Sequence, residues 1–414
     1  MAIVEGVRRA LAVRARALLG SGHAARQSLV ALVLNSATSL IAGAFLGSIT
    51  STFSALPGLL VMVPAAIGLR GNVFSGVGNR ISTAIHTGTL ELSARRDGVL
   101  AQNTAAALCL TLSMSVVLAV LAKVVAVASG VTGTVPVLTL CMISVLGGLL
   151  ASVAVLAATV GLAVGSVRYG WDLDNLTAPL VSTLGDVLTL PALWLASLLV
   201  GVPWLVTVLG VVLGLGSLAA LALAWRSSLA VLRRVVREST PVLVAAAGLS
   251  TLAGVTIERR LQTFTAFPAL LVLVPAFVSS AGAMGGILSA RLASKLHLGL
   301  VAARPIPQPD AARDGALILL LGAPVFLFNA AGAHVLAQLL GQASPGLGPV
   351  MVTSMVGGLV ATAFALLVGY YATAGAMGAG VDPDTYGVPI VTSAVDFGGA
   401  LALIATLSIL GIAR

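Results

Sequence analysis

Eleven long apolar segments constrain the fold of this chain more than any other feature of its sequence. Each is long enough, at about 20 residues, to cross the hydrocarbon core of a bilayer as a helix. The segments cover roughly 28–50, 55–78, 99–129, 134–166, 175–199, 203–225, 239–257, 265–290, 312–341, 347–373 and 385–412. Charged residues make up only 8% of the chain, whereas a soluble domain carries roughly 25%. The sequence therefore predicts an all-α polytopic membrane protein with about eleven transmembrane helices.

Basic residues predict how these helices are oriented. Most Lys and Arg residues lie before the first segment or after the even-numbered ones. Because cytoplasmic loops are enriched in Lys and Arg, we expect the N-terminus in the cytoplasm and the C-terminus outside. Arg259 and Arg260, after the seventh segment, are exceptions to this pattern. The net charge of +9 then reflects membrane topology, and we expect no nucleic-acid partner.

The chain contains an internal duplication. Residues 57–88 align without a gap with residues 268–299, and residues 172–190 align with residues 382–400. The two offsets, 211 and 210, are nearly equal, which indicates a repeated unit. Each half would hold five helices, and the sixth helix would join them. Because of that joining helix, both halves would cross the membrane in the same direction, related by a pseudo-two-fold axis along the membrane normal.

This duplication predicts four segments. The first is a basic cytoplasmic arm, either an interfacial helix or a disordered tail, and the two repeats are separated by a linker helix with a basic loop. The arm covers 1–27, the first repeat 28–200, the linker 201–237 and the second repeat 238–414.

Two acidic residues fall well inside the predicted spans, and they occupy equivalent positions in the two halves. They are Asp186 and Asp396. An ionised carboxylate in hydrocarbon is costly, so it is expected to face a partner, water or an ion. Arg70 is the evident basic partner within a span, and one arginine cannot pair with both acids. We therefore predict an ion pathway lined by the two aspartates.

The residues around these aspartates supply oxygen ligands. Ser182 and Thr392 lie four residues before the aspartates, on the same helical face. Pro179 and Pro389 lie seven residues before them and free backbone carbonyls nearby. Carboxylate, hydroxyl and carbonyl oxygens are hard ligands, which suit Mg²⁺, Ca²⁺ or Mn²⁺. Since Mg²⁺ sheds water reluctantly, a few carboxylates around a hydrated ion would suffice.

A further set of acids lies at the predicted cytoplasmic starts of the fifth and eleventh helices. Asp174 and Asp384 either form an acidic ring that concentrates cations at the inner mouth or cap the helix N-termini, and both roles are compatible. Asp172 and Asp382 are expected at the surface.

A Gly-Asn step in the second helix offers one more ligand. The amide oxygen of Asn72 could accept a hydrogen bond from a hydrated ion, while Gly71 permits either close approach or helix packing. The counterpart of Asn72 is Ala283, so any contact would be one-sided. Arg70 would repel cations if it faced the pathway and could instead pair with an acid while the site is empty.

The histidines and cysteines suggest structural roles. His86 and His297 repeat at the ends of equivalent helices, where interfacial or backbone contacts are expected and a pH-sensing or metal role stays open. Cys109 and Cys141 lie in apolar segments without metal-ligand spacing and are expected to be buried and reduced.

At these segments the sequence resembles the MgtE-type magnesium transporters, and most closely the fused two-unit form found in eukaryotic solute-carrier magnesium transporters. The resemblance rests on PGLLVMVPA, RGN and NRISTA within 57–84 and on DLDNLTAPLVSTLGD at 172–186. It implies Mg²⁺ conduction between two five-helix units. It also implies that Asp186 and Asp396 are the essential carboxylates, with Asn72 contributing from one half.

Two departures from the family pattern affect what the resemblance implies. Ala283 replaces the second asparagine, which argues against symmetric coordination. Bacterial members have cytoplasmic sensor domains, but only about 27 residues precede the first predicted span here, so we expect gating without such a domain.

Three functions would use a pair of intramembrane acids. The first is a Mg²⁺-permeable channel or uniporter driven by membrane potential, and the second is a Na⁺- or H⁺-coupled Mg²⁺ exchanger using the same acids. The third is an intramembrane aspartyl protease with two carboxylates sharing a proton, but no motif of that class is evident. No P-loop motif is evident either. We therefore expect a transporter rather than an enzyme, embedded in lipid, with Mg²⁺ as transported ion and possible bound ligand, and with one chain sufficient for one pore.

Overall fold

The structure is a computed structural model, and it describes five stretches of the chain. These are residues 22–86, 98–169, 173–297, 301–378 and 383–412. Most of the predicted N-terminal arm, and both Asp172 and Asp382, lie outside the described residues.

Within these stretches the regular structure is entirely helical. Eleven helices are long and apolar enough to span a membrane, as the sequence predicts. They are α2 (Gly22–Ser48), α4 (Leu59–His86), α5 (Val99–Ala128), α6 (Val137–Tyr169), α7 (Leu173–Ser197), α8 (Pro203–Trp225), α9 (Ala230–Glu258), α11 (Pro268–His297), α12 (Pro309–Leu339), α13 (Leu347–Gly378) and α14 (Pro383–Ile409). Three short elements connect them: α3 (Thr50–Ala55), the 3₁₀ turn η1 (Leu198–Gly201) and α10 (Leu261–Ala266).

Several helices are longer than the apolar segments that predicted them. Helix α9 begins at Ala230 rather than near residue 239, and it includes the charged stretch around Arg234 and Glu238. Helices α4 and α11 likewise continue about eight residues past their apolar segments, to His86 and His297. Hydropathy detects only the part of a helix that lies in hydrocarbon, whereas backbone hydrogen bonding continues into the polar interface.

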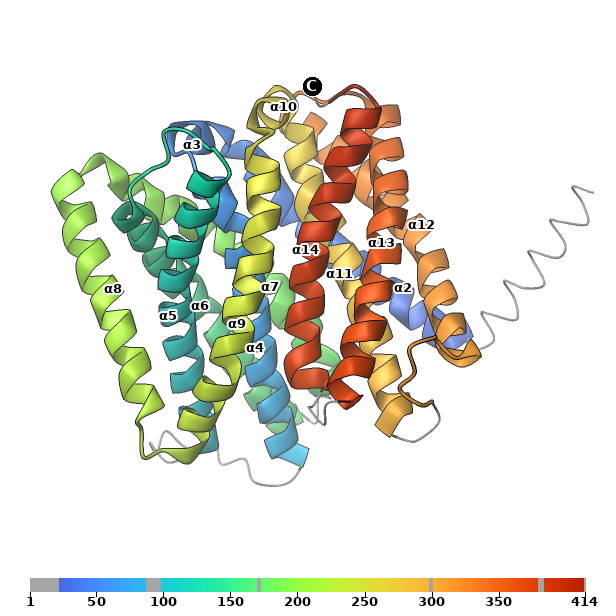
Figure 1. Ribbon diagram of the computed structural model, residues 1–414, viewed down its shortest axis with the longest axis horizontal. Helices are drawn as coiled ribbons and strands as arrows, with labels where there is room; N and C mark the ends of the chain where they lie inside the picture. Colours follow the sequence, from blue (N-terminus) through green and yellow to red (C-terminus); the bar gives the residue numbers. More distant parts are fainter. Residues whose placement is uncertain (1–21, 87–97, 170–172, 298–300, 379–382, 413–414) are drawn as a thin grey trace, which may run out of the picture.

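The helices form one bundle whose outer surface is apolar. Helix α8 lies at one edge of the bundle (Figure 1) and presents large exposed side chains such as Trp204, Leu215 and Leu223. It packs on α5 and α6. Exposed apolar side chains of this kind are suited to contact with lipid tails. The molecule is therefore an integral membrane protein whose outermost helix mainly faces lipid.

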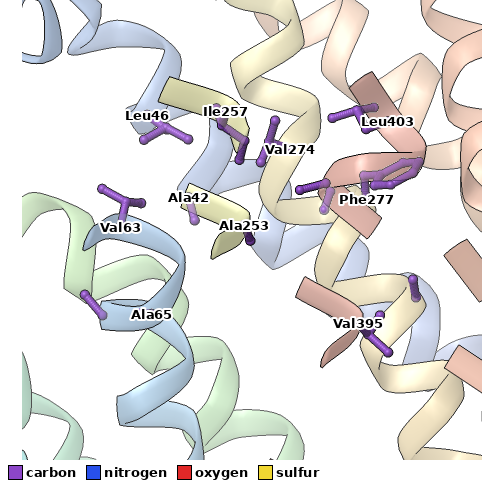
Figure 2. Packing of buried hydrophobic residues seen from close by; sticks show 14 of the residues in the cluster. Ala42, Leu46, Val63, Ala65, Ala253, Ile257, Val274, Phe277, Val395 and Leu403 are labelled. Carbon is purple, nitrogen blue, oxygen red and sulfur yellow. The ribbon is translucent and has the colours of Figure 1, made fainter. Parts of the chain in front are cut away.

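The first helix of each predicted half packs against the other half. Helix α2 contacts α11 and α12, and helix α9 contacts α4 and α5. Figure 2 shows the centre of this packing, where Ala42 of α2 and Ala253 of α9 lie in one cluster with side chains of α4, α11 and α14. Contacts between residues far apart in the sequence therefore hold the bundle together.

Two glycines permit these close crossings. A Cβ atom added at Gly43 of α2 would overlap the carbonyl oxygen of Val272 on α11. A Cβ atom added at Gly254 of α9 would overlap the carbonyl oxygen of Val61 on α4. Small residues that let backbones approach are the usual device for packing helices in membranes.

Polar contacts join α4 to α5, and α11 to α12, near the C-terminal ends of α4 and α11. The Nε atom of Arg80 donates to Oδ1 of Asn103 at 2.7 Å, and Nη1 of Arg291 lies 3.7 Å from Oδ1 of Asp314. Burial lowers the pKa of Arg80 to about 10, so its guanidinium remains protonated at neutral pH. The nitrogen of Lys295 also pairs with Asp314.

The repeat boundaries and the symmetry axis stay predictions. Equivalent elements nevertheless have matching bounds: α3 and α10 are offset by 211 residues, and α7 and α14 begin 210 residues apart. The short helices α3 and α10 lie at the same end of the bundle (Figure 1).

Candidate functional site

The two predicted aspartates lie on α7 and α14, where the bundle buries them. The side chain of Asp186 is buried, with 7% of the residue exposed, and Asp396 is partly buried. Each helix carries its proline near the N-terminal end, at Pro179 and Pro389. A carboxylate in such a position needs polar partners.

Each aspartate accepts a hydrogen bond from a serine on a different helix. The hydroxyl of Ser39 on α2 donates to Oδ2 of Asp186 at 3.3 Å. The hydroxyl of Ser250 on α9 donates to Oδ2 of Asp396 at 2.6 Å. The serines are 211 residues apart and the aspartates 210 apart, so the two pairs are equivalent in the duplication. Hydrogen bonds to a carboxylate are stronger than neutral ones and fix its orientation.

Asp186 and Asp396 lie on two helices, α7 and α14, that both pack against α4. No ion pair between either of them and a basic residue occurs in the described stretches. Two like charges so placed would attract a divalent cation between them.

A narrow cleft lies beside Asp396, between α4, α9 and α14. Its lining includes Asn72 of α4, Ser250 of α9 and Ser393 of α14. A Cβ atom added at Gly68 of α4 would lie 3.6 Å from Oδ2 of Asp396, so the backbone of α4 approaches the carboxylate closely. The cleft is too narrow to hold a water molecule in this conformation.

The equivalent interface between α2 and α11 is different. There the counterpart of Gly68 is Ser279, whose hydroxyl accepts a hydrogen bond from Nδ2 of Asn35 at 3.1 Å. The hydroxyls of Ser36 and Ser280 lie 2.9 Å apart, and Nδ2 of Asn329 donates to Ser280 at 3.0 Å. The interface beside Asp186 is thus joined by a buried polar network, while the one beside Asp396 is mostly apolar and lined by Asn72.

Arg70 does not pair with either aspartate. Its side chain is buried, and Nη1 donates to the carbonyl oxygen of Ala66 one turn earlier on α4. The guanidinium lies beside Ser115 of α5 and Gly148 of α6. An ion pair of Arg70 with an acid, one alternative that the sequence left open, is thus not found among the described residues.

The remaining predicted residues are only partly described. The hydroxyl of Thr392 donates to the carbonyl oxygen of Pro389 at 3.1 Å. Ser182, Asp174 and Asp384 lie on α7 and α14, but their side chains are outside the described part of the structure, as are those of the two repeated histidines. Their roles stay predictions.

The structure also describes the two cysteines. Cys109 on α5 and Cys141 on α6 are both buried and unpaired, as the sequence predicts.

Sequence reasoning missed Ser39 and Ser250. The signal was present, because SLIAG at 39–43 and STLAG at 250–254 repeat at the same offset of 211. Each motif combines the serine that bonds an aspartate with the glycine that permits the helix crossing.

The described residues offer few other metal ligands. Within them no group of three or more His, Cys, Asp and Glu side chains is close enough to hold a metal ion. The ligands available near Asp186 and Asp396 are therefore two carboxylates, hydroxyls and one amide.

Comparison with known families and proteins gives matches over both halves. The model of a family described as MgtE, divalent cation transporter, matches residues 63–196 and again residues 274–406. Solute carrier family 41 member 3 of Mus musculus is 24% identical over 374 residues, covering 85% of this chain and 75% of that protein. Solute carrier family 41 member 2 of Xenopus laevis is 24% identical over 386 residues, covering 87% of this chain and 67% of that protein. No solved structure matches the chain.

Proposed function

The chain belongs to the MgtE family of divalent cation transporters, and we propose that it conducts Mg²⁺ past Asp186 and Asp396 under the membrane potential. Membership of this family makes the chain a transporter rather than an enzyme, as the sequence predicts. The proposed path runs between two five-helix units, residues 28–200 and 238–414, joined by a linker at 201–237. The N-terminus is proposed to face the cytoplasm, and one chain would suffice for one path.

The observation that carries this proposal is the pair of serine–aspartate hydrogen bonds. Ser39 with Asp186 and Ser250 with Asp396 present two oriented carboxylates from equivalent places in the duplication. The family model also matches twice, starting at residues 63 and 274, which have the offset of 211 found in the sequence. A path between two like units explains why the intramembrane acids occur as a matched pair.

The ligand chemistry favours a hydrated ion. Two carboxylates match the charge of a divalent cation, and hard oxygen ligands suit Mg²⁺. Mg²⁺ usually keeps several waters and needs only one or two carboxylates. Asn72, beside Ser250 in the cleft, is proposed to contact these waters from one side only. Asp174 and Asp384 are proposed to attract cations at the cytoplasmic mouth, with Ser182 and Thr392 assisting along the path.

Transport then requires an opening movement. The cleft beside Asp396 is too narrow for water, and we propose that α4, α9 and α14 separate to admit a hydrated ion to the carboxylate. The α2–α11 interface is held by the network of Asn35, Ser36, Ser279 and Ser280. We propose that the apolar interface of α9 with α4 and α14 is the one that opens.

The test is Mg²⁺ entry into proteoliposomes under an imposed negative-inside potential. The wild-type chain should show potential-driven entry without a Na⁺ or H⁺ gradient. Asp186→Asn and Asp396→Asn should each lower the entry rate at least tenfold, because each variant removes one of the two charges that attract the ion.

Asp310→Asn is the matched control. Asp310 is exposed on α12 and pairs with Arg313, so the same substitution there should leave entry unchanged. Unchanged entry in folded Asp186→Asn and Asp396→Asn variants would show that the path lies elsewhere. Entry that requires a Na⁺ or H⁺ gradient would replace the channel by a coupled exchanger.

A further inference from the structure

We propose that a small monovalent anion, such as chloride, binds at the guanidinium of Arg70 inside the first half of the chain. This group makes no hydrogen bond with either serine–aspartate pair. The proposal therefore goes beyond the cation transport proposed above and does not depend on it.

Arg70 is a buried cation with unused hydrogen-bond donors. Only 1% of the residue is exposed. Nη1 donates to the carbonyl oxygen of Ala66, but Nε and Nη2 are buried without a hydrogen-bond partner. A guanidinium has five N–H donors and no acceptor, and it stays charged. A buried charge is stable only when a counter-charge and hydrogen-bond partners accompany it.

No acidic residue in the described stretches supplies that counter-charge. Every ion pair found there joins other residues, at Glu238, Asp310 and Asp314. The intramembrane acids Asp186 and Asp396 bond to serines instead. Nε and Nη2 of Arg70 therefore have no acceptor among the described residues, and an anion bound there would supply one.

The hydroxyl of Ser115 lies near the guanidinium, beside Gly148. A Cβ atom added at Gly148 would lie 2.9 Å from Nη2 of Arg70 and 2.7 Å from the hydroxyl oxygen of Ser115. Nη2 of Arg70 and the hydroxyl of Ser115 thus both lie against the backbone of α6 at Gly148. The hydroxyl of Ser115 is buried and has no partner.

More unpartnered hydroxyls continue along the same two helix faces. Thr111 lies one turn from Ser115 on α5, and Ser144 and Ser152 lie one turn on either side of Gly148 on α6. The hydroxyl oxygens of all three are buried without hydrogen-bond partners. A guanidinium beside hydroxyl donors forms the donor set that a halide ion requires, since such an ion accepts hydrogen bonds and donates none.

The second half shows that the fold does not need polar groups here. The counterparts of Arg70 and Ser115 are Ala281 and Phe326. The buried ring of Phe326 lies against Gly358, the counterpart of Gly148. An aromatic ring thus occupies the place that Arg70 and Ser115 approach in the first half. Ser144 and Ser152 have hydroxyl counterparts in Ser354 and Thr362, but Arg70 and Ser115 are specific to the first half, which supports a ligand beside them.

The test is a halide titration of the thermal unfolding of the purified full chain. Chloride replaces gluconate at constant ionic strength, and tryptophan fluorescence reports unfolding. The wild-type chain should show a saturable rise in unfolding temperature, on the order of 3 °C, because a ligand that binds only the folded state stabilises it.

Three variants locate the site. Arg70→Met should abolish the chloride response, because it removes the charge. Gly148→Ala should abolish or strongly weaken it, since the new methyl group displaces Arg70 and Ser115. Ser115→Ala, which adds no atoms, should raise the apparent dissociation constant about tenfold. It keeps the test decisive if Gly148→Ala does not fold.

Gly161→Ala is the control on the same helix. An added Cβ there would meet nothing within 4 Å, so the chloride response should equal that of the wild type. A wild-type chain whose unfolding temperature does not depend on chloride would overturn the proposal, with water as the partner of Arg70. A response that persists in Arg70→Met would also overturn it, because the halide would then bind elsewhere.

Discussion

At the scale of single residues, the serine–aspartate pair is the chemical unit of the candidate site. Ser39 and Ser250 orient Asp186 and Asp396 from neighbouring helices, and both pairs are kept although their surroundings differ. A carboxylate held by a hydroxyl keeps its remaining lone pairs for a hydrated cation. The serine thus positions the acid rather than neutralising it.

Ser250→Ala tests that role. The substitution removes a hydrogen bond to a charged group, worth about 1.5 kcal/mol, so Mg²⁺ entry into proteoliposomes should fall about tenfold. Ser250→Thr keeps a hydroxyl and should recover most of the rate. Ser54→Ala, at an exposed serine on α3, is the control and should transport like the wild type. A Ser250→Ala chain with full activity would refute the positioning role.

At the scale of helices, two glycine crossings decide how closely the bundle can pack. Gly43 brings α2 against α11, and Gly254 brings α9 against α4. Each glycine follows its serine by four residues, on the same helical face. Close approach at the glycine and the hydrogen bond at the serine are therefore two results of one helix contact.

Gly254→Ala should destabilise the chain by about 1–3 kcal/mol, because the added methyl group overlaps the backbone of Val61 and forces the helices apart. The measurement is the thermal unfolding temperature of the purified chain. Gly248→Ala on the same helix meets nothing within 4 Å and should change stability by less than about 0.5 kcal/mol. Equal unfolding temperatures for the two variants would contradict the close crossing.

At the scale of the whole molecule, the first helices are exchanged between the predicted halves. Helix α2 packs on α11 and α12, and α9 packs on α4 and α5. The central cluster in Figure 2 draws side chains from both predicted halves, while a second buried cluster lies mainly in α4, α5 and α6 of the first half. Each candidate aspartate therefore accepts its hydrogen bond from the first helix of its own half, and that helix packs against the other half.

The exchange predicts a specific cross-link. The hydroxyls of Ser36 and Ser280 lie 2.9 Å apart, so Ser36→Cys with Ser280→Cys should form a disulfide on mild oxidation, joining α2 to α11. Gel mobility after cleavage between α2 and α11 measures it. Leu34→Cys with Ser280→Cys is the control, because Leu34 is exposed on α2 and should not cross-link. Failure of the first pair to cross-link would contradict the exchanged packing.

Much of the fold could be predicted from local physics. A backbone in hydrocarbon must satisfy its hydrogen bonds within each segment, so eleven apolar segments of sufficient length predict eleven helices. The duplication was visible because both halves kept their prolines and aspartates at one offset. Because a charge in lipid is costly, Asp186 and Asp396 could be identified from the sequence as candidate site residues. Their role stays a prediction.

The partners of those residues depended on tertiary structure. Hydropathy does not predict which face of a transmembrane helix contacts another helix, because lipid tails and apolar side chains are equally apolar. Packing alone selects the neighbouring helix. Ser39 and Ser250 therefore meet the aspartates only because α2 and α9 cross the bundle at Gly43 and Gly254.

The sequence by itself thus determined the number of helices, the duplication and the two buried acids, since each depends on the local cost of polar groups in a membrane. Only the tertiary structure decided which helix meets which, that the cleft beside Asp396 is closed, and that Arg70 lies beside Ser115 rather than an acid. These features depend on the shape fit of side chains far apart in the chain, which no local pattern encodes.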